Sequence, residues 1–166
     1  MKYTSAEAAK LLRRLNEEQV TLKSKEEKAA VFVAAIEEDQ ENVRPAYAYE
    51  EVQRRLAALE ARVRQVKHAI NLFNLTTQVP GFDMTVDQML VYIPQLNERK
   101  RKLTRMASRL PMEREAAYGA KAIVEYSYAN YDICRAEADL AAVTDELSRA
   151  QTALDVVNNS VTLEIE

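Results

Sequence analysis

The chain has 166 residues, of which 30% are charged, and its formal net charge is −3 at neutral pH. The length predicts a single elongated helical domain over residues 1–166, and the charge excludes the strong basic excess of a dedicated nucleic-acid-binding domain. With two glycines, four prolines and one cysteine, the composition favours long helices and excludes an internal disulfide.

The first predicted helix covers residues of about 5–40. Thr4 and Glu7 have the spacing of a capping box, in which a hydroxyl and a carboxylate bond the first free amides of a helix. Apolar residues then follow at alternating steps of three and four, the pattern of a coiled-coil seam. Gln19 and Glu26 interrupt this seam. They are expected either to fix the register or to face solvent where the partner helix diverges.

The second predicted helix covers residues of about 46–76, and apolar or aromatic residues fill every three-four step of its seam. The turn dipeptide Pro80-Gly81 follows its end. A second capping box, from Thr85 to Gln88, opens the next helix.

The third predicted helix covers residues of about 86–110 and contains Pro94. A proline inside a helix lacks the amide donor and clashes with the carbonyl four residues before it. We therefore expect a kink or a break near residue 94.

The fourth predicted helix, residues 133–159, has the most regular seam in the chain. At 1.5 Å per residue it would be about 40 Å long. Its apolar positions average 3.5 residues per turn, which is typical of a coiled coil. They are Ile133, Ala136, Leu140, Val143, Leu147, Ala150, Leu154, Val157 and Val161.

Two short segments alternate apolar and polar residues, which predicts strands at about 122–128 and 161–165. Because a lone strand exposes unpaired backbone groups, each needs a neighbour. The two leave opposite ends of the last helix, so we expect the tail of one subunit to pair with residues near 122–128 of another.

The predicted fold class is therefore mainly all-α, with four long helices in antiparallel coiled-coil hairpins and a small β element. Helices of about 30 residues reach ~45 Å, well beyond the radius of gyration near 15 Å of a compact chain of this length. Such hairpins bury little surface alone, so we expect a homo-oligomer.

A basic stretch on the third helix and a tyrosine-rich segment after it are the candidate ligand-binding residues. They would bind a phosphate-bearing partner, such as nucleotide, nucleic acid or anionic lipid. A solvated helix face and a tyrosine-rich subunit interface are the favoured alternatives. The candidates are Arg99, Arg101, Lys102, Arg105, Arg109, Tyr126 and Tyr128, with Lys100 at a seam position.

The remaining reactive residues suggest no catalytic or metal site. His68 lacks the carboxylate three residues before it that a di-iron bundle would use, so it is interpreted as structural or solvent-facing. Cys134 follows Asp132, a plausible N-cap, so a reactive thiol is conceivable, but a packed cysteine is favoured. We expect no enzyme activity, no metal and no cofactor.

Several residues resemble a bacterial family of uncharacterised helical proteins, some of whose members carry the name septicolysin. The resemblance covers residues of about 46–166, and the septicolysin name implies a membrane-active toxin. The matching residues are Ile70-Asn71-Leu72-Phe73-Asn74, Gly81, Thr85, Asp139-Leu140, Glu146-Leu147, Gln151 and Asn158.

Three functions are therefore weighed. The first is a non-enzymatic, self-associating interaction or scaffold protein, with itself as partner. The second is a homo-oligomer that binds a phosphorylated small molecule at subunit junctions, and the third is a membrane-active protein. The N-terminus has no secretory signal and the longest uncharged apolar run is too short to span a bilayer, so a cytoplasmic location is expected, with neither a membrane nor specific nucleic acid as partner.

Overall fold

A computed structural model describes residues 1–115 and 124–165. The chain divides into two compact units, one formed by Met1–Thr77 with Val156–Glu166 and the other by Gln78–Asp155. This division is finer than the single domain expected from the sequence. The fold class is as predicted, since long helices dominate and the strands are short and antiparallel.

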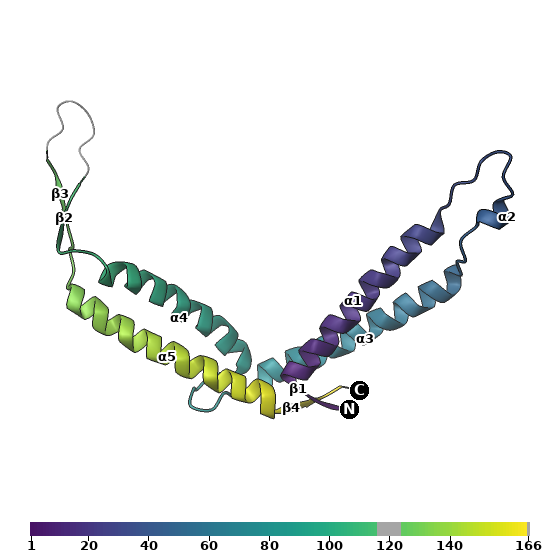
Figure 1. Ribbon diagram of the computed structural model, residues 1–166. Helices are drawn as coiled ribbons and strands as arrows, with labels where there is room; N and C mark the ends of the chain where they lie inside the picture. The colour runs from purple at the N-terminus through teal and green to yellow at the C-terminus, as the bar shows by residue number, and fades with distance from the viewer. Residues whose placement is uncertain (116–123, 166) are drawn as a thin grey trace. The chain divides into compact units, whose positions relative to one another are not determined.

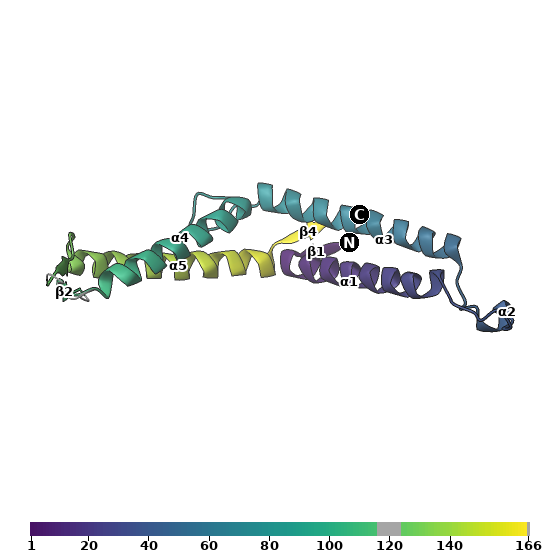
Figure 2. The ribbon, with the colours of Figure 1, turned by 90° about the horizontal axis from the view of Figure 1, so that it is seen from above.

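The first unit is a helical hairpin closed at one end by a small sheet (Figure 1). Helix α1 (Ser5–Ala30) and helix α3 (Tyr49–Thr76) lie side by side in both views, joined by a loop that contains the single-turn α2 (Gln40–Val43) (Figures 1 and 2). Strand β1 (Lys2–Thr4) pairs antiparallel with β4 (Thr162–Glu164), so the two chain termini lie together. The Met1 ammonium donates to the Ile165 carbonyl over 3.0 Å.

Apolar seam residues form the core of this unit, as the three-four spacing predicts. The end of α5 (Ile133–Ser160), a third long helix, belongs to this unit and contributes Val157 to its core. The buried side chains of the first unit are Ala8, Leu15, Leu56, Leu59, Val66, Phe73, Val157, Leu163 and Ile165.

The two polar seam residues of α1 hydrogen-bond to α3. The Gln19 amide donates to the Glu60 carboxylate over 3.0 Å. Glu26 accepts from the Tyr47 hydroxyl, which precedes α3, over 2.8 Å and from the Gln53 amide over 2.6 Å. These bonds join α1 to α3 and to the residues just before it, as the first of the two expected roles would require.

Helix α1 ends at Ala30, ten residues before the predicted end near residue 40. The segment that follows is rich in β-branched and aromatic residues, which have low helix propensity. Its backbone is extended at Val31, and the side chains of Val33 and Ile36, assigned to the seam, are fully or almost fully exposed. Without a facing helix to bury them, the apolar pattern alone does not continue α1.

The second unit pairs α4 (Val86–Ala107) with most of α5, in antiparallel directions (Figure 1). The turn before α4 contains Gly81 at φ +81°, the conformation that the third residue of a type II turn requires, and Phe82 donates to the Val79 carbonyl over 3.1 Å. The buried side chains of this unit are Val79, Val86, Met89, Leu96, Ala136, Val143, Leu147, Ala150 and Leu154.

Helix α4 runs through Pro94 without a break, contrary to one of the two outcomes expected there. Pro94 is exposed, and the Leu90 side chain, four residues before it, is also exposed. The Leu90 carbonyl that loses its intrahelical partner is therefore on the solvent side of α4, where it is accessible to water.

The predicted strands form, but their partners differ from the prediction. Strand β4 pairs with β1, and β3 (Tyr126–Tyr128) pairs antiparallel with β2 (Met112–Arg114). Because each strand has a neighbour in its own chain, the reason for expecting the tail to pair with residues near 122–128 of another subunit is removed, and that pairing stays a prediction. Residues 122 and 123 of the predicted strand lie outside the described residues.

Candidate interaction surfaces

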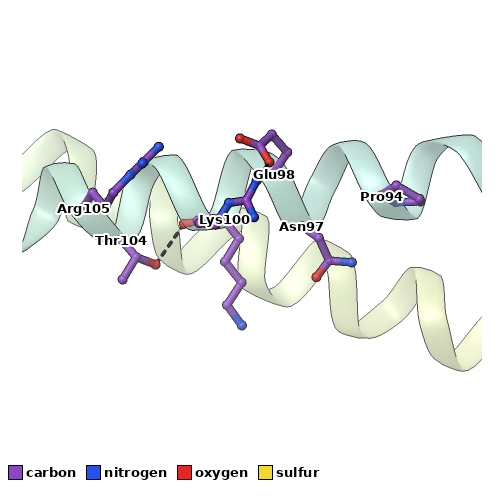
Figure 3. Close-up of a pocket in the computed structure, with 7 residues that line it drawn as sticks. Pro94, Asn97, Glu98, Lys100, Thr104 and Arg105 are labelled. Carbon is purple, nitrogen blue, oxygen red and sulfur yellow. Dashed lines mark hydrogen bonds and ion pairs between the residues drawn. The ribbon is translucent and has the colours of Figure 1, made fainter.

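An open hollow with a volume of about 780 Å³ lies along the basic stretch of α4 (Figure 3). The residues that line it follow helical spacing along a single helix. They are Pro94, Asn97, Glu98, Lys100, Arg101, Thr104 and Arg105.

These side chains spread apart instead of converging on one point. In Figure 3, Lys100 points to one side of α4, and Glu98 and Arg105 point to the other. Arg101 forms an ion pair with Glu98, which neutralises one of the cations. A bound phosphate group needs donors directed at the same oxygens, and this surface does not provide them from α4 alone.

Two other predicted residues, Arg99 and Lys102, lie on the groove between α4 and α5. The groove holds about 440 Å³ and is also lined by the acidic Asp139 and Glu146 of α5. Because acidic side chains face the basic ones here, this groove is a contact between helices with opposite charges and not a concentrated cationic site.

A polar contact joins the two helices close to this groove. The Tyr92 hydroxyl of α4 donates to the Glu146 carboxylate of α5 over 2.5 Å. This hydrogen bond and the partial burial of the ring raise the pKa of Tyr92, because the neutral hydroxyl donates while the phenolate would face a carboxylate.

Tyr126 and Tyr128 lie on the two-stranded β2–β3 ribbon, away from the α4 groove residues. The ribbon register places Met112 opposite Tyr128 and Arg114 opposite Tyr126. Since directly paired residues share a face and alternate residues in a strand do as well, these four side chains occupy one face. We name Met112, Arg114, Tyr126 and Tyr128 the ribbon face; all four are exposed.

The opposite face of the ribbon has a different chemistry, with Glu113 opposite Ser127. The base of the ribbon is fixed to α4, because Ala129 donates to the Pro111 carbonyl over 3.1 Å and the Tyr131 hydroxyl donates to the Met106 carbonyl over 2.8 Å. Sequence reasoning found the tyrosines but missed Met112 and Arg114. The three residues of β2, Met-Glu-Arg, show no alternation of apolar and polar residues that could have indicated a strand.

A second exposed surface was missed because its apolar residues fitted the predicted seam. The segment of residues 31–41 runs from the end of α1 into the first residues of α2, and we name it the acidic loop. It combines the exposed apolar side chains of Val31, Val33 and Ile36 with acidic ones. The acidic members are Glu37, Glu38, Asp39 and Glu41, all exposed.

The remaining candidates lie apart from these surfaces. Arg109 is exposed just beyond the end of α4, and His68 is exposed on α3. Cys134 is also exposed, so the packed interpretation is wrong: Ile133 and Ala136 take the inward positions of that turn. Arg135 donates its amide to Asp132, which confirms the predicted N-cap.

The described residues contain neither a cluster of metal ligands nor a helix able to cross a membrane. Nowhere in residues 1–115 and 124–165 do three or more His, Cys, Asp or Glu side chains gather as metal ligands would. Over the same part of the chain, every helix is too short or too polar to cross a bilayer.

The chain is similar in fold to a solved structure, a functionally unknown conserved protein from Corynebacterium diphtheriae. The match has a TM-score of 0.61 and covers 99% of this chain and 100% of the other, at 18% sequence identity. No family model and no curated protein matches the sequence. At this identity the likeness is one of fold alone.

Proposed function

We propose that this protein is a non-enzymatic, self-associating interaction protein that builds a homo-oligomer from its helical hairpins. The observation that supports the proposal most directly is the apolar surface that each unit leaves exposed. Exposed large apolar side chains include Val31, Val33 and Ile36 in the first unit and Leu110, Met112 and Tyr128 in the second.

This surface is concentrated at the acidic loop and on the ribbon face. Exposed apolar surface bounded by charged residues is typical of protein interaction sites.

Native mass spectrometry of the purified protein tests the proposal. We expect a mass that is a multiple of the 18.9 kDa chain. A bare monomer over the micromolar range would contradict it.

The same spectrum tests a second candidate function, the capture of a phosphorylated small molecule at subunit junctions. Five cations of the basic stretch, Arg99, Lys100, Lys102, Arg105 and Arg109, form no ion pair with any residue that the structure describes. In an oligomer, side chains of two copies would have to complete the convergent site that one α4 lacks. Extra bound mass on the oligomer, lost after Arg105→Ala, would favour this function.

A further inference from the structure

The acidic loop exposes apolar side chains at residues that lie outside any helix or strand. Val31 is 78% exposed, Val33 is 91% exposed and Ile36 is fully exposed at 105%. An exposed cluster of branched apolar side chains costs solvation free energy that burial against a partner would recover. This loop is therefore a surface that gains from being covered.

The ribbon face is a second surface that lacks a packing partner. A single two-stranded ribbon is marginally stable in water unless something packs on one of its faces. Tyr128 is 66% exposed and Met112 51% exposed, so nothing in the described part of the chain covers this face. Tyrosine, methionine and arginine together are the residues enriched in the centres of protein interfaces.

Charge distinguishes the two surfaces and makes them complementary. Glu37 and Glu38 border the apolar part of the acidic loop and form no ion pair in the described residues. Arg114 lies on the ribbon face, and Arg109 lies at the end of α4 from which the ribbon begins. Opposite charges around apolar centres steer association and fix its orientation.

We propose that the acidic loop of one copy docks on the ribbon face of a second copy. Val33 and Ile36 would cover Met112 and Tyr128, while Glu37 and Glu38 would face the arginines. This inference rests on the proposed self-association and specifies its contact. Because each copy carries both surfaces, the contact closes into a symmetric pair or ring, or continues as an open chain.

Charge exchange tests this contact. One variant carries Glu37→Lys and Glu38→Lys, a second carries Arg109→Glu and Arg114→Glu, and a third carries all four changes. We expect each two-site variant to associate at least about tenfold more weakly than wild type, and the four-site variant to recover association. Sedimentation velocity measures the dissociation constants, and circular dichroism checks the helical content.

A matched control changes two exposed acidic residues away from both surfaces, Glu27→Lys and Glu137→Lys. We expect this control to associate as strongly as wild type, because it changes the net charge without changing either surface. If both two-site variants assemble with the same dissociation constant as wild type, the docking contact is overturned. The proposed self-association would still stand. A folded four-site variant that fails to reassociate would also overturn the contact.

Monomeric wild type would overturn the contact and the proposed function together. Monomeric wild type that sediments with vesicles of anionic lipid, and loses this binding with Arg109→Glu and Arg114→Glu, would assign the ribbon face to a membrane surface instead.

Discussion

Tyr92 and Glu146 show how one residue pair links two helices of the second unit. The hydroxyl donates to a carboxylate at the edge of the α4–α5 contact, so the bond depends on the tyrosine keeping its proton. A charged acceptor makes such a bond stronger than a neutral one, and access of water reduces its contribution.

Replacing Tyr92 with phenylalanine removes this bond and keeps the ring. We expect the free energy of unfolding to fall by about 1 kcal/mol at neutral pH, the usual size for one intramolecular hydrogen bond. Urea unfolding measures this change. The matched control is Tyr49→Phe, because Tyr49 is exposed and its hydroxyl makes no hydrogen bond in the described residues.

The pH dependence of this contribution has a definite sign. The pKa of Tyr92 is raised in the folded chain, so the bond contributes fully below the unfolded pKa of about 10 and is lost as pH rises through the folded value. Wild type should therefore lose more stability than Tyr92→Phe between neutral and strongly alkaline pH. Equal losses in the two proteins would contradict this role of Tyr92.

At the residue scale, local chemistry was the predictable part. The capping boxes at Thr4 and Thr85 form as expected, since each depends on residues three positions apart. The packed interpretation of Cys134 was wrong although the sequence contained the information to correct it. Ile133 and Ala136 belong to the seam of α5, so Cys134 lies off the side of α5 that meets α4.

The helix α4 tolerates Pro94 because the position faces solvent. An interior proline costs about 3 kcal/mol relative to alanine in a helix. Pro94→Ala should restore the hydrogen bond to the Leu90 carbonyl and raise the free energy of unfolding by about 1–3 kcal/mol. Thermal and urea unfolding measure the gain, with Gln95→Ala on the same helix as control. An unchanged or lower stability would contradict this account of α4.

The packing of α4 on α5 depends on its few buried residues. Leu96 is 1% exposed and Leu90 on the same helix is 48% exposed. Leu96→Ala should destabilise the second unit by about 2–5 kcal/mol through lost burial and a residual cavity. Leu90→Ala should cost less than about 1 kcal/mol. Chemical unfolding distinguishes them, and equal effects would show that the assigned inward face of α4 is wrong.

At the element scale, the long helices were predictable and their partners were not. Three-four periodicity identifies a helix and its buried side over many turns. It does not show where a facing helix ends, so α1 was extended through Val33 and Ile36. The strands β1 and β2 have three residues each, too few for a periodic signal, and the partners of β4 and β3 were therefore missed.

At the scale of the whole molecule, each of the two units leaves apolar side chains exposed. Hairpins two helices thick bury one stripe per helix and leave the rest in water. The sequence indicated this from helix length, and it located the basic residues and tyrosines. It could not indicate that the tyrosines share a face with Arg114, because that depends on the pairing of β2 with β3.

The interactions proposed between copies should weaken with salt. Exposed charges separated by more than a Debye length, about 8 Å at physiological ionic strength, are largely screened. We expect the association constant measured by sedimentation velocity to fall as salt is raised, and the four-site charge exchange to show the same trend. An association that strengthens with salt would indicate a purely apolar contact and exclude the role of Glu37 and Glu38.

Self-association is the central claim, and sedimentation equilibrium of the wild-type chain at several concentrations tests it most directly. We expect a weight-average mass above the 18.9 kDa of one chain, either at every concentration or increasingly as the concentration rises. A mass equal to that of one chain at every concentration would contradict it.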